Sequence, residues 1–466
     1  AHRRNRLVYS NTRLPAQRQR VMIDLSPELA TIALFALLVL LITTGYPLAL
    51  TLGGVAMVIG YLGKGFTIFD VFYLRAFSVV TEYTFMAIPL FIFMAVMVEK
   101  SGISEQLFQT LFLWIGRIRG SLAIVTIITG TILAATMGIF SASVVMLGLV
   151  ALPAMMDRGY QKELATGSIC AAGCLGILIP PSLMLILYGP MSGISVGKLF
   201  IAAIPSGFVL SGLYMGYIII RCFLNPKLGP APSREETEAV SWSKKLQLLF
   251  TSLIPPMGLI GAVLGSIFFG LATPTEAAGV GAVASFLMAF AYGRLTWNVV
   301  RDTTYHTLKV SSMICLLVIG GFMFTGTFMA LGCAEVVKDF ILWVPFGRWG
   351  SFSVIMFIVF FLGMFIDWVG ILLIIIPIVT PIAETLKFDE LWFAMMICIS
   401  LQIAYLSPPY APAIFLLRGV IPDSYGISTN TIIRGVVPYI LLITFALALF
   451  IAFPGIITWL PGKMIK

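Results

Sequence analysis

The amino-acid sequence predicts an all-α polytopic membrane protein, built as an inverted repeat with five spans and one re-entrant helical hairpin in each half. Composition is the first observation: 59% of the residues are hydrophobic, 11% are charged and the mean hydropathy is +1.03. A soluble domain has roughly 25% charged residues. The second observation is a duplication at a constant shift along the chain, in which Pro153, Cys170, Pro180 and Pro181 reappear as Pro381, Cys398, Pro408 and Pro409.

Apolar runs close to the ~20 residues that a membrane-crossing helix needs occur in both halves. They cover residues 29–44, 49–62, 85–98, 164–188 and 199–220, and then 249–271, 277–292, 310–331, 391–417 and 437–460. An odd number of crossings per half would place the second copy upside-down in the lipid bilayer.

Polar segments divide the chain. We expect a basic N-terminal tail at 1–25, a first membrane repeat at 26–221, a polar hinge at 222–247 and a second membrane repeat at 248–466. The net charge of +9 comes from Lys and Arg in connecting segments, where such residues orient a membrane protein. Nucleic acid is therefore not expected as a partner.

Two long apolar segments, at about 121–156 and 351–383, are interrupted in the middle by small or polar residues. The interruptions lie at 138–143 and 363–368. A helical hairpin fits each segment better than one long helix. Lipid tolerates such a re-entrant loop only where its tip is buried in protein or lines a cavity.

A proline pair follows each hairpin inside an apolar helix. Proline supplies no N–H and repels the carbonyl four residues earlier, so the pair breaks the helix and frees carbonyl oxygens. Dehydrated Na⁺ binds such oxygens, and exposed N–H groups at half-helix N-termini suit an anionic substrate. In the first half we expect Ser141 and Ser143 to face the carbonyls around Gly173 and Gly176, with Pro180 beside the substrate.

In the second half, Asp367 and the backbone near Gly363 are expected to face Ser407 and Pro408. Ser143, Asp367 and Pro408 are also candidates for contact with the substrate. An ionisable residue in an apolar segment is costly and usually functional, so an ion or proton role is favoured for Asp367. The alternative is that Asp367 caps a helix. Arg418 could bind a substrate carboxylate, or it could anchor the end of a span at the interface.

Simpler explanations exist for these features. Proline pairs can merely kink helices, and Ser and Gly can merely allow close packing. The segment Thr273-Pro274-Thr275-Glu276 is predicted to be a capping box, with a coupling carboxylate at Glu276 as the less favoured alternative.

Enzyme chemistry is not expected. The sequence contains no P-loop signature and no HExxH motif, and an intramembrane serine protease would need a histidine within the spans. Neither His2 nor His306 lies convincingly in a span. The six cysteines lack CxxC spacing, so we interpret them as small packing residues rather than metal ligands.

Four motifs together resemble one family. They are residues 102–105 followed by 116–120, the Ser141-Ala142-Ser143 tip, the segment Gly176-Ile177-Leu178-Ile179-Pro180-Pro181-Ser182, and Thr273-Pro274-Thr275-Glu276-Ala277. The chain from about residue 32 to 460 resembles the large membrane subunit of a tripartite ATP-independent periplasmic (TRAP) transporter. Two departures are Ala142, where Gly is common, and Ser407, where Thr is usual.

This resemblance implies Na⁺-driven uptake of a small organic acid across a bacterial inner (cytoplasmic) membrane. A mobile transport domain would move against a static scaffold like an elevator. The implied partners are a periplasmic substrate-binding protein and a small four-span membrane subunit. The family's sodium sites match Ser141, Ser143, Gly176, Gly363, Asp367 and Ser407. A stand-alone sodium/carboxylate carrier is the alternative, and an intramembrane enzyme is less favoured.

Overall fold

The computed structural model describes residues 25–116, 118–231 and 240–464. The predicted basic tail at 1–25 lies outside the described residues except for its last position, and so does the middle of the predicted hinge, 232–239. All regular secondary structure in the described ranges is helical.

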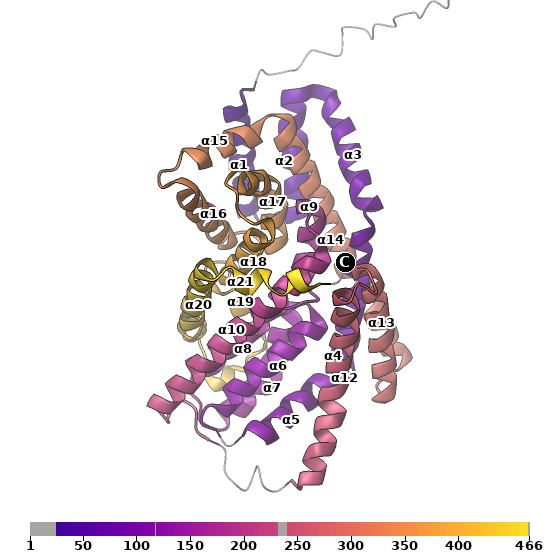
Figure 1. Ribbon diagram of the computed structural model, residues 1–466, viewed down its shortest axis with the longest axis vertical. Helices are drawn as coiled ribbons and strands as arrows, with labels where there is room; N and C mark the ends of the chain where they lie inside the picture. The colour runs from indigo at the N-terminus through magenta and orange to yellow at the C-terminus, as the bar shows by residue number, and fades with distance from the viewer. Residues whose placement is uncertain (1–24, 117, 232–239, 465–466) are drawn as a thin grey trace, which may run out of the picture.

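A run of α-helices makes up the described part of the first half of the chain (Figure 1). They are α1 (Pro27–Thr43), α2 (Leu48–Lys64), α3 (Ile68–Thr81), α4 (Ala87–Lys100), α5 (Ile103–Ile115), α6 (Ser121–Met137), α7 (Phe140–Met156), α8 (Lys162–Leu178), α9 (Leu183–Ser192) and α10 (Val196–Leu224).

The second half follows a similar order. Its helices are α12 (Trp242–Phe268), α13 (Pro274–Ala291), α14 (Trp297–Ala330), α15 (Cys333–Trp343), α16 (Gly347–Gly363), α17 (Trp368–Thr385), α18 (Glu390–Leu406), α19 (Pro412–Val420), α20 (Thr429–Ala452) and the short α21 (Gly455–Thr458). The starts of α7 and α17, and likewise the starts of α8 and α18, are separated by the same shift as the duplicated prolines.

One difference between the halves was not expected from the sequence. Residues 68–100 form two helices, α3 and α4, whereas the corresponding residues form the single 34-residue helix α14. The Glu82 carboxylate accepts hydrogen bonds from the backbone N–H of Thr84, at 3.2 Å, and from its hydroxyl, at 2.8 Å. These bonds stabilise the break before α4, while Val310 occupies the corresponding position in α14 and has no such side chain.

Two pairs of helices form the candidate hairpins. Only Gly138 and Ile139 separate α6 from α7, and four residues, 364–367, separate α16 from α17. Gly138 has φ +58°, and a Cβ there would lie 2.4 Å from the carbonyl oxygen of Pro181, so this turn requires glycine. Figure 1 shows α6 and α7 towards the lower end of the molecule and α16 and α17 towards the upper end.

Helices from the two halves are interleaved. Helix α2 packs on α14 and α4 packs on α13, while α8 packs on α6, α7 and α20. Each candidate hairpin also contacts the opposite half, because α7 packs on α19 and α17 packs on α9. Small residues permit some of these contacts: a Cβ on Gly167 of α8 would lie 2.1 Å from the carbonyl oxygen of Gly435 in α20.

The connection between the halves is shorter than the predicted hinge at 222–247. Helix α10 continues to Leu224, and α12 begins at Trp242 because Ser241 caps it by accepting from the backbone N–H of Lys244 at 3.4 Å. The connection is also attached to the first half. The carbonyl of Gly229 accepts from the backbone N–H of Gly120 at 2.9 Å, at the start of α6.

Nine helical segments in the described ranges are long and apolar enough to cross a membrane, judged by length and composition. Ten crossings were expected, and eight of them are among these nine segments; the ninth is the hairpin helix α17. Among the helices expected to cross, α1 and α18 have only 17 residues each and belong to a group of shorter apolar helices, together with the hairpin helices α6, α7 and α16.

Candidate functional site

The first broken helix is formed by α8 and α9, which are separated by residues 179–182. Pro180 has no N–H, so the carbonyl of Gly176 lacks the donor that a continuous helix would supply. The Ser182 hydroxyl donates to the next carbonyl, that of Ile177. The predicted substrate residue Pro180 is buried at this break.

The tip of the first hairpin packs directly on α8 through two glycines. A Cβ on Gly173 would lie 2.2 Å from Cγ2 of Val144, and a Cβ on Gly176 would lie 3.5 Å from Cα of Phe140. Both glycines predicted for the sodium site therefore lie against residues of the tip. Replacing the hydrogen of Gly173 by a methyl group would crowd this contact, whereas a methyl group on Gly176 would make ordinary van der Waals contacts.

The two predicted serines lie in the same tip. Ser143 is fully buried, and its hydroxyl donates to the carbonyl of Ile139 at 3.4 Å, within the tip itself. Ser141 is partly exposed, one residue after the start of α7. Both serines therefore lie beside the contact that Phe140 and Val144 make with α8. The described hydrogen bonds of the Ser143 hydroxyl are to residues of the hairpin itself.

In the second hairpin, Asp367 caps α17. Its Oδ2 accepts from the backbone N–H of Val369 at 3.3 Å, and its Oδ1 accepts from the hydroxyl of Tyr410 at 3.4 Å. The helix-capping alternative is therefore present in the structure, and an ion-binding role for Asp367 stays a prediction. Because Tyr410 also donates its backbone N–H to the carbonyl of Met364 at 3.1 Å, the second tip is attached to the second broken helix.

Gly363 has the same packing role here as Gly173 in the first half. A Cβ on Gly363 would lie 2.2 Å from Cβ of Ala404, in the last turn of α18. Ser407 is 5% exposed and ends α18, and its carbonyl accepts from the backbone N–H of Ala411 at 3.3 Å. Pro408 follows directly, so all the candidates of the second half except Arg418 gather at one junction.

Arg418 lies in the last turn of α19, away from that junction. Its guanidinium forms an ion pair with Asp423 at 3.1 Å, and the Asp423 side chain is 93% exposed. This pairing accounts for the residue structurally, and its role as a substrate ligand stays a prediction.

The two junctions are linked by aromatic residues that were not among those predicted for the site. Phe140, the first residue of α7, and Tyr405 of α18 pack edge-to-face with ring centroids 4.5 Å apart. The Tyr405 hydroxyl and both polar atoms of the Gln402 amide are buried without a hydrogen-bond partner among the described residues. In the sequence, Gln402 and Tyr405 stand out as polar side chains in an apolar helix just before a proline pair, and this could have indicated that they belong to the site.

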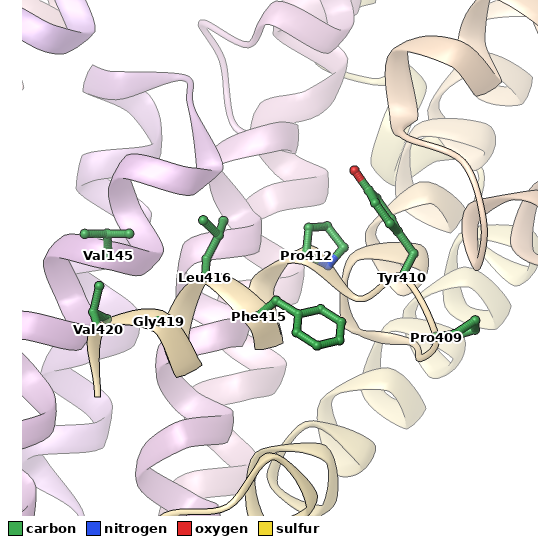
Figure 2. Close-up of a pocket in the computed structure, with 8 residues that line it drawn as sticks. All are labelled: Val145, Pro409, Tyr410, Pro412, Phe415, Leu416, Gly419 and Val420. Carbon is green, nitrogen blue, oxygen red and sulfur yellow. The ribbon is translucent and has the colours of Figure 1, made fainter. Parts of the chain in front are cut away.

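An open groove runs beside the second junction, along α19 (Figure 2). Figure 2 shows Val145 of α7 beside Leu416 and Val420 of α19, with the hydroxyl of Tyr410 pointing away from the apolar wall. The groove has a volume of about 610 Å³ and is lined almost entirely by apolar side chains. It marks where the first hairpin meets the second broken helix.

A family model described as "Tripartite ATP-independent periplasmic transporter, DctM component" matches residues 35–456. The chain belongs to this family. As a member, it is a subunit of a bacterial transporter and a multi-pass membrane protein rather than an enzyme. Membership also implies a small permease subunit and a substrate-binding protein as partners of this TRAP permease.

Curated relatives span most of the chain. The chain is 27% identical over 451 residues to the C4-dicarboxylate TRAP transporter large permease protein DctM of Rhodobacter capsulatus, covering 92% of this chain and 100% of that protein. It is 29% identical over 385 residues to the sialic acid TRAP transporter large permease protein SiaM of Vibrio cholerae, covering 82% and 87%. It is 27% identical over 436 residues to the ectoine/5-hydroxyectoine permease UehC of Ruegeria pomeroyi, covering 92% and 97%.

The fold is also similar to that of a solved transporter. The Alcanivorax borkumensis YdaH structure matches with a TM-score of 0.58 at 16% identity, covering 92% of this chain and 99% of that chain. At this identity the likeness concerns the fold alone. Family membership, rather than this likeness, favours a TRAP permease over the stand-alone carrier that the sequence left as an alternative.

Proposed function

We propose that this TRAP permease carries out Na⁺-coupled secondary active uptake of a small organic acid, which an extracytoplasmic binding protein delivers. The observation that supports this proposal best is the pairing of two interrupted hairpins with two interrupted helices. A glycine allows each hairpin to pack closely on its broken helix, Gly173 in the first half and Gly363 in the second. The ring contact between Phe140 and Tyr405 joins the two junctions.

The donor chemistry at the junctions suits Na⁺. The Gly176 carbonyl lacks its helical donor because of Pro180, and the Ala404 carbonyl lacks one because of Pro408. Oxygens from Ser141, Ser143, Asp367 and Ser407 are the other candidates. The ion is carried with the substrate, so each site must release it again on the far side of the membrane.

The start of α7 suits the substrate. Residues in the first turn of a helix have backbone N–H groups without intrahelical acceptors, and the helix dipole favours a negative charge there. Helix α7 has no side-chain cap at its N-terminus. Relatives named for C4-dicarboxylates and for sialic acid support an organic acid, whereas the relative named for ectoine widens the range of solutes.

The packing also supports an inverted repeat and an elevator movement. The candidate hairpins lie towards opposite ends of the molecule (Figure 1), as two copies of opposite orientation would require. Helices α2, α4, α13 and α14 pack on each other across the two halves and would form the scaffold. The hairpins with α8, α9, α18 and α19 would form the moving part.

Reconstituted uptake tests this proposal. The permease, its small subunit and the binding protein encoded beside them are placed with liposomes, and uptake of an organic acid is followed with an inward Na⁺ gradient. An equal K⁺ gradient serves as the control. We expect uptake only with Na⁺ and only with the binding protein. Equal uptake with K⁺ would refute the sodium coupling.

A further inference from the structure

Arg75 is an ionisable side chain in an otherwise apolar stretch of α3, and it is turned towards the protein. Its neighbours Tyr73 and Leu74 are 68% and 63% exposed, whereas Arg75 is only partly exposed. A Cβ on Gly326 of α14 would lie 3.0 Å from Cγ1 of Val71, 3.3 Å from Cγ of Arg75 and 3.6 Å from its Nε. The aliphatic part of the Arg75 side chain therefore lies over Gly326 and does not extend away from the protein.

The guanidinium has no hydrogen bond, ion pair or aromatic partner among the described residues. An unpaired charge in an apolar segment is expensive, and in membrane proteins such residues usually bind or conduct something. The surroundings of Arg75 indicate what it binds.

A cavity of about 300 Å³ lies in front of Arg75. Helices α3 and α14 form one side of the cavity, and α9 and α17 form the other. The remaining lining residues are Pro190, Met191, Phe322, Thr325, Met329, Pro377, Thr380 and Pro381. Among these described lining residues there is no acidic side chain, and Arg75 is the charged one that a negative group in the cavity would meet.

Both hydroxyl protons in the wall are already used. The Thr325 hydroxyl donates to the carbonyl of Leu373 at 3.0 Å, which Pro377 leaves without its helical donor. The Thr380 hydroxyl donates to the carbonyl of Ile376 at 2.8 Å. Arg75 is thus the one lining side chain with hydrogen-bond donors still available.

We infer that this cavity binds an oxyanion, a carboxylate or phosphate group held by the Arg75 guanidinium, whose planar donors match either group. Apolar walls around one cationic end suit an amphiphilic anion. The group could belong to an anionic lipid or to the transported acid. Either would connect α3 and α14 with α9 and α17, at a place separate from the two tips, and the inference does not depend on sodium binding there.

The test uses the full-length chain in nanodiscs with two probes. The first probe is phosphatidylglycerol, mixed into phosphatidylcholine and measured as lipid retained in native mass spectrometry. The second is succinate, measured by its stabilising shift of the unfolding temperature. We expect Arg75→Gln to weaken binding of one probe about tenfold or more, because charged hydrogen bonds are lost, and Arg75→Lys to weaken it less.

Arg434, an exposed arginine on α20, supplies the matched control as Arg434→Gln, which is expected to bind both probes like the wild type. Loss of phosphatidylglycerol identifies a lipid site, and loss of succinate identifies a solute site. If Arg75→Gln does not fold, Met191→Trp fills the cavity and keeps the charge. The inference would be overturned if the folded variant, Arg75→Gln or Met191→Trp, bound both probes as tightly as the wild type.

Discussion

Replacing Gly173 with Ala should separate the first tip from α8. The new Cβ would lie 2.2 Å from Cγ2 of Val144 and 3.1 Å from its backbone N and Cα, where ordinary contacts begin at 3.4 Å. The side chain of Val144 must therefore move by more than an ångström, and the backbone contacts limit how far it can. Overpacking of this kind typically costs about 1–3 kcal/mol.

If the docked tip is the state that binds sodium, this cost lowers the affinity for Na⁺. One to three kcal/mol corresponds to a factor of about 5 to 150 at a tenfold change per ~1.4 kcal/mol. We expect the Na⁺ concentration for half-maximal uptake to rise by about this factor. The assay is uptake into proteoliposomes over a series of Na⁺ concentrations, with thermal unfolding measured in parallel.

Gly216→Ala is the matched control. Gly216 also lies inside a helix, α10, but no atom of the described residues lies within 4 Å of a Cβ added there. Alanine is the better helix former, so this variant should be as stable as the wild type or up to about 1 kcal/mol more stable. An unchanged Na⁺ dependence in folded Gly173→Ala would refute the reasoning. So would an equal loss in Gly216→Ala.

Three further changes test other contacts. Asp367→Asn keeps a residue that caps α17 well but removes the negative charge. A loss of Na⁺-dependent uptake at an unchanged unfolding temperature would indicate that Asp367 binds the ion. Intact uptake would mean that Asp367 acts only as a helix cap. Tyr405→Phe keeps the ring against Phe140 and removes the buried hydroxyl that has no hydrogen-bond partner among the described residues; we expect a higher KM for the solute. Tyr439→Phe is the control: the Tyr439 hydroxyl is also buried without such a partner, but its ring packs on Tyr214, so KM should not change. Thr273→Ala removes the capping box of α13 and should lower stability by about 1 kcal/mol with an unchanged KM, measured by thermal unfolding and uptake.

Features set by local chemistry could be predicted from the sequence. Thr273 accepts from the backbone N–H of Glu276 at 3.3 Å, and Glu276 accepts in return from Thr273 at 2.7 Å, so the capping box is confirmed. Helices α8 and α18 end just before the proline pairs because proline cannot continue a helix. Helices α6 and α7 occupy the range 121–156 given by the sequence.

Features set by contacts between distant residues could not be predicted. The Phe140–Tyr405 pair joins positions in opposite halves of the chain, and nothing local to either ring indicates the other. The break between α3 and α4 is stabilised by the Glu82 side chain, and the sequence of this segment did not indicate that the corresponding residues of the two halves would differ. The Arg75 side chain lies over Gly326 of another helix, a contact that no local pattern around Arg75 indicates.

The exchange of partners between α7 and α19, and between α9 and α17, affects how this protein is made. The first hairpin leaves the ribosome long before the helix that will cover its second arm. Until α19 is synthesised, α7 can pack on α6 and α8 of its own half, but the face that α19 covers stays open. A chain cut between α10 and α12 would therefore yield two fragments that each keep a tip and its broken helix but lack the contacts from the other half, and they would regain these contacts only by assembling together.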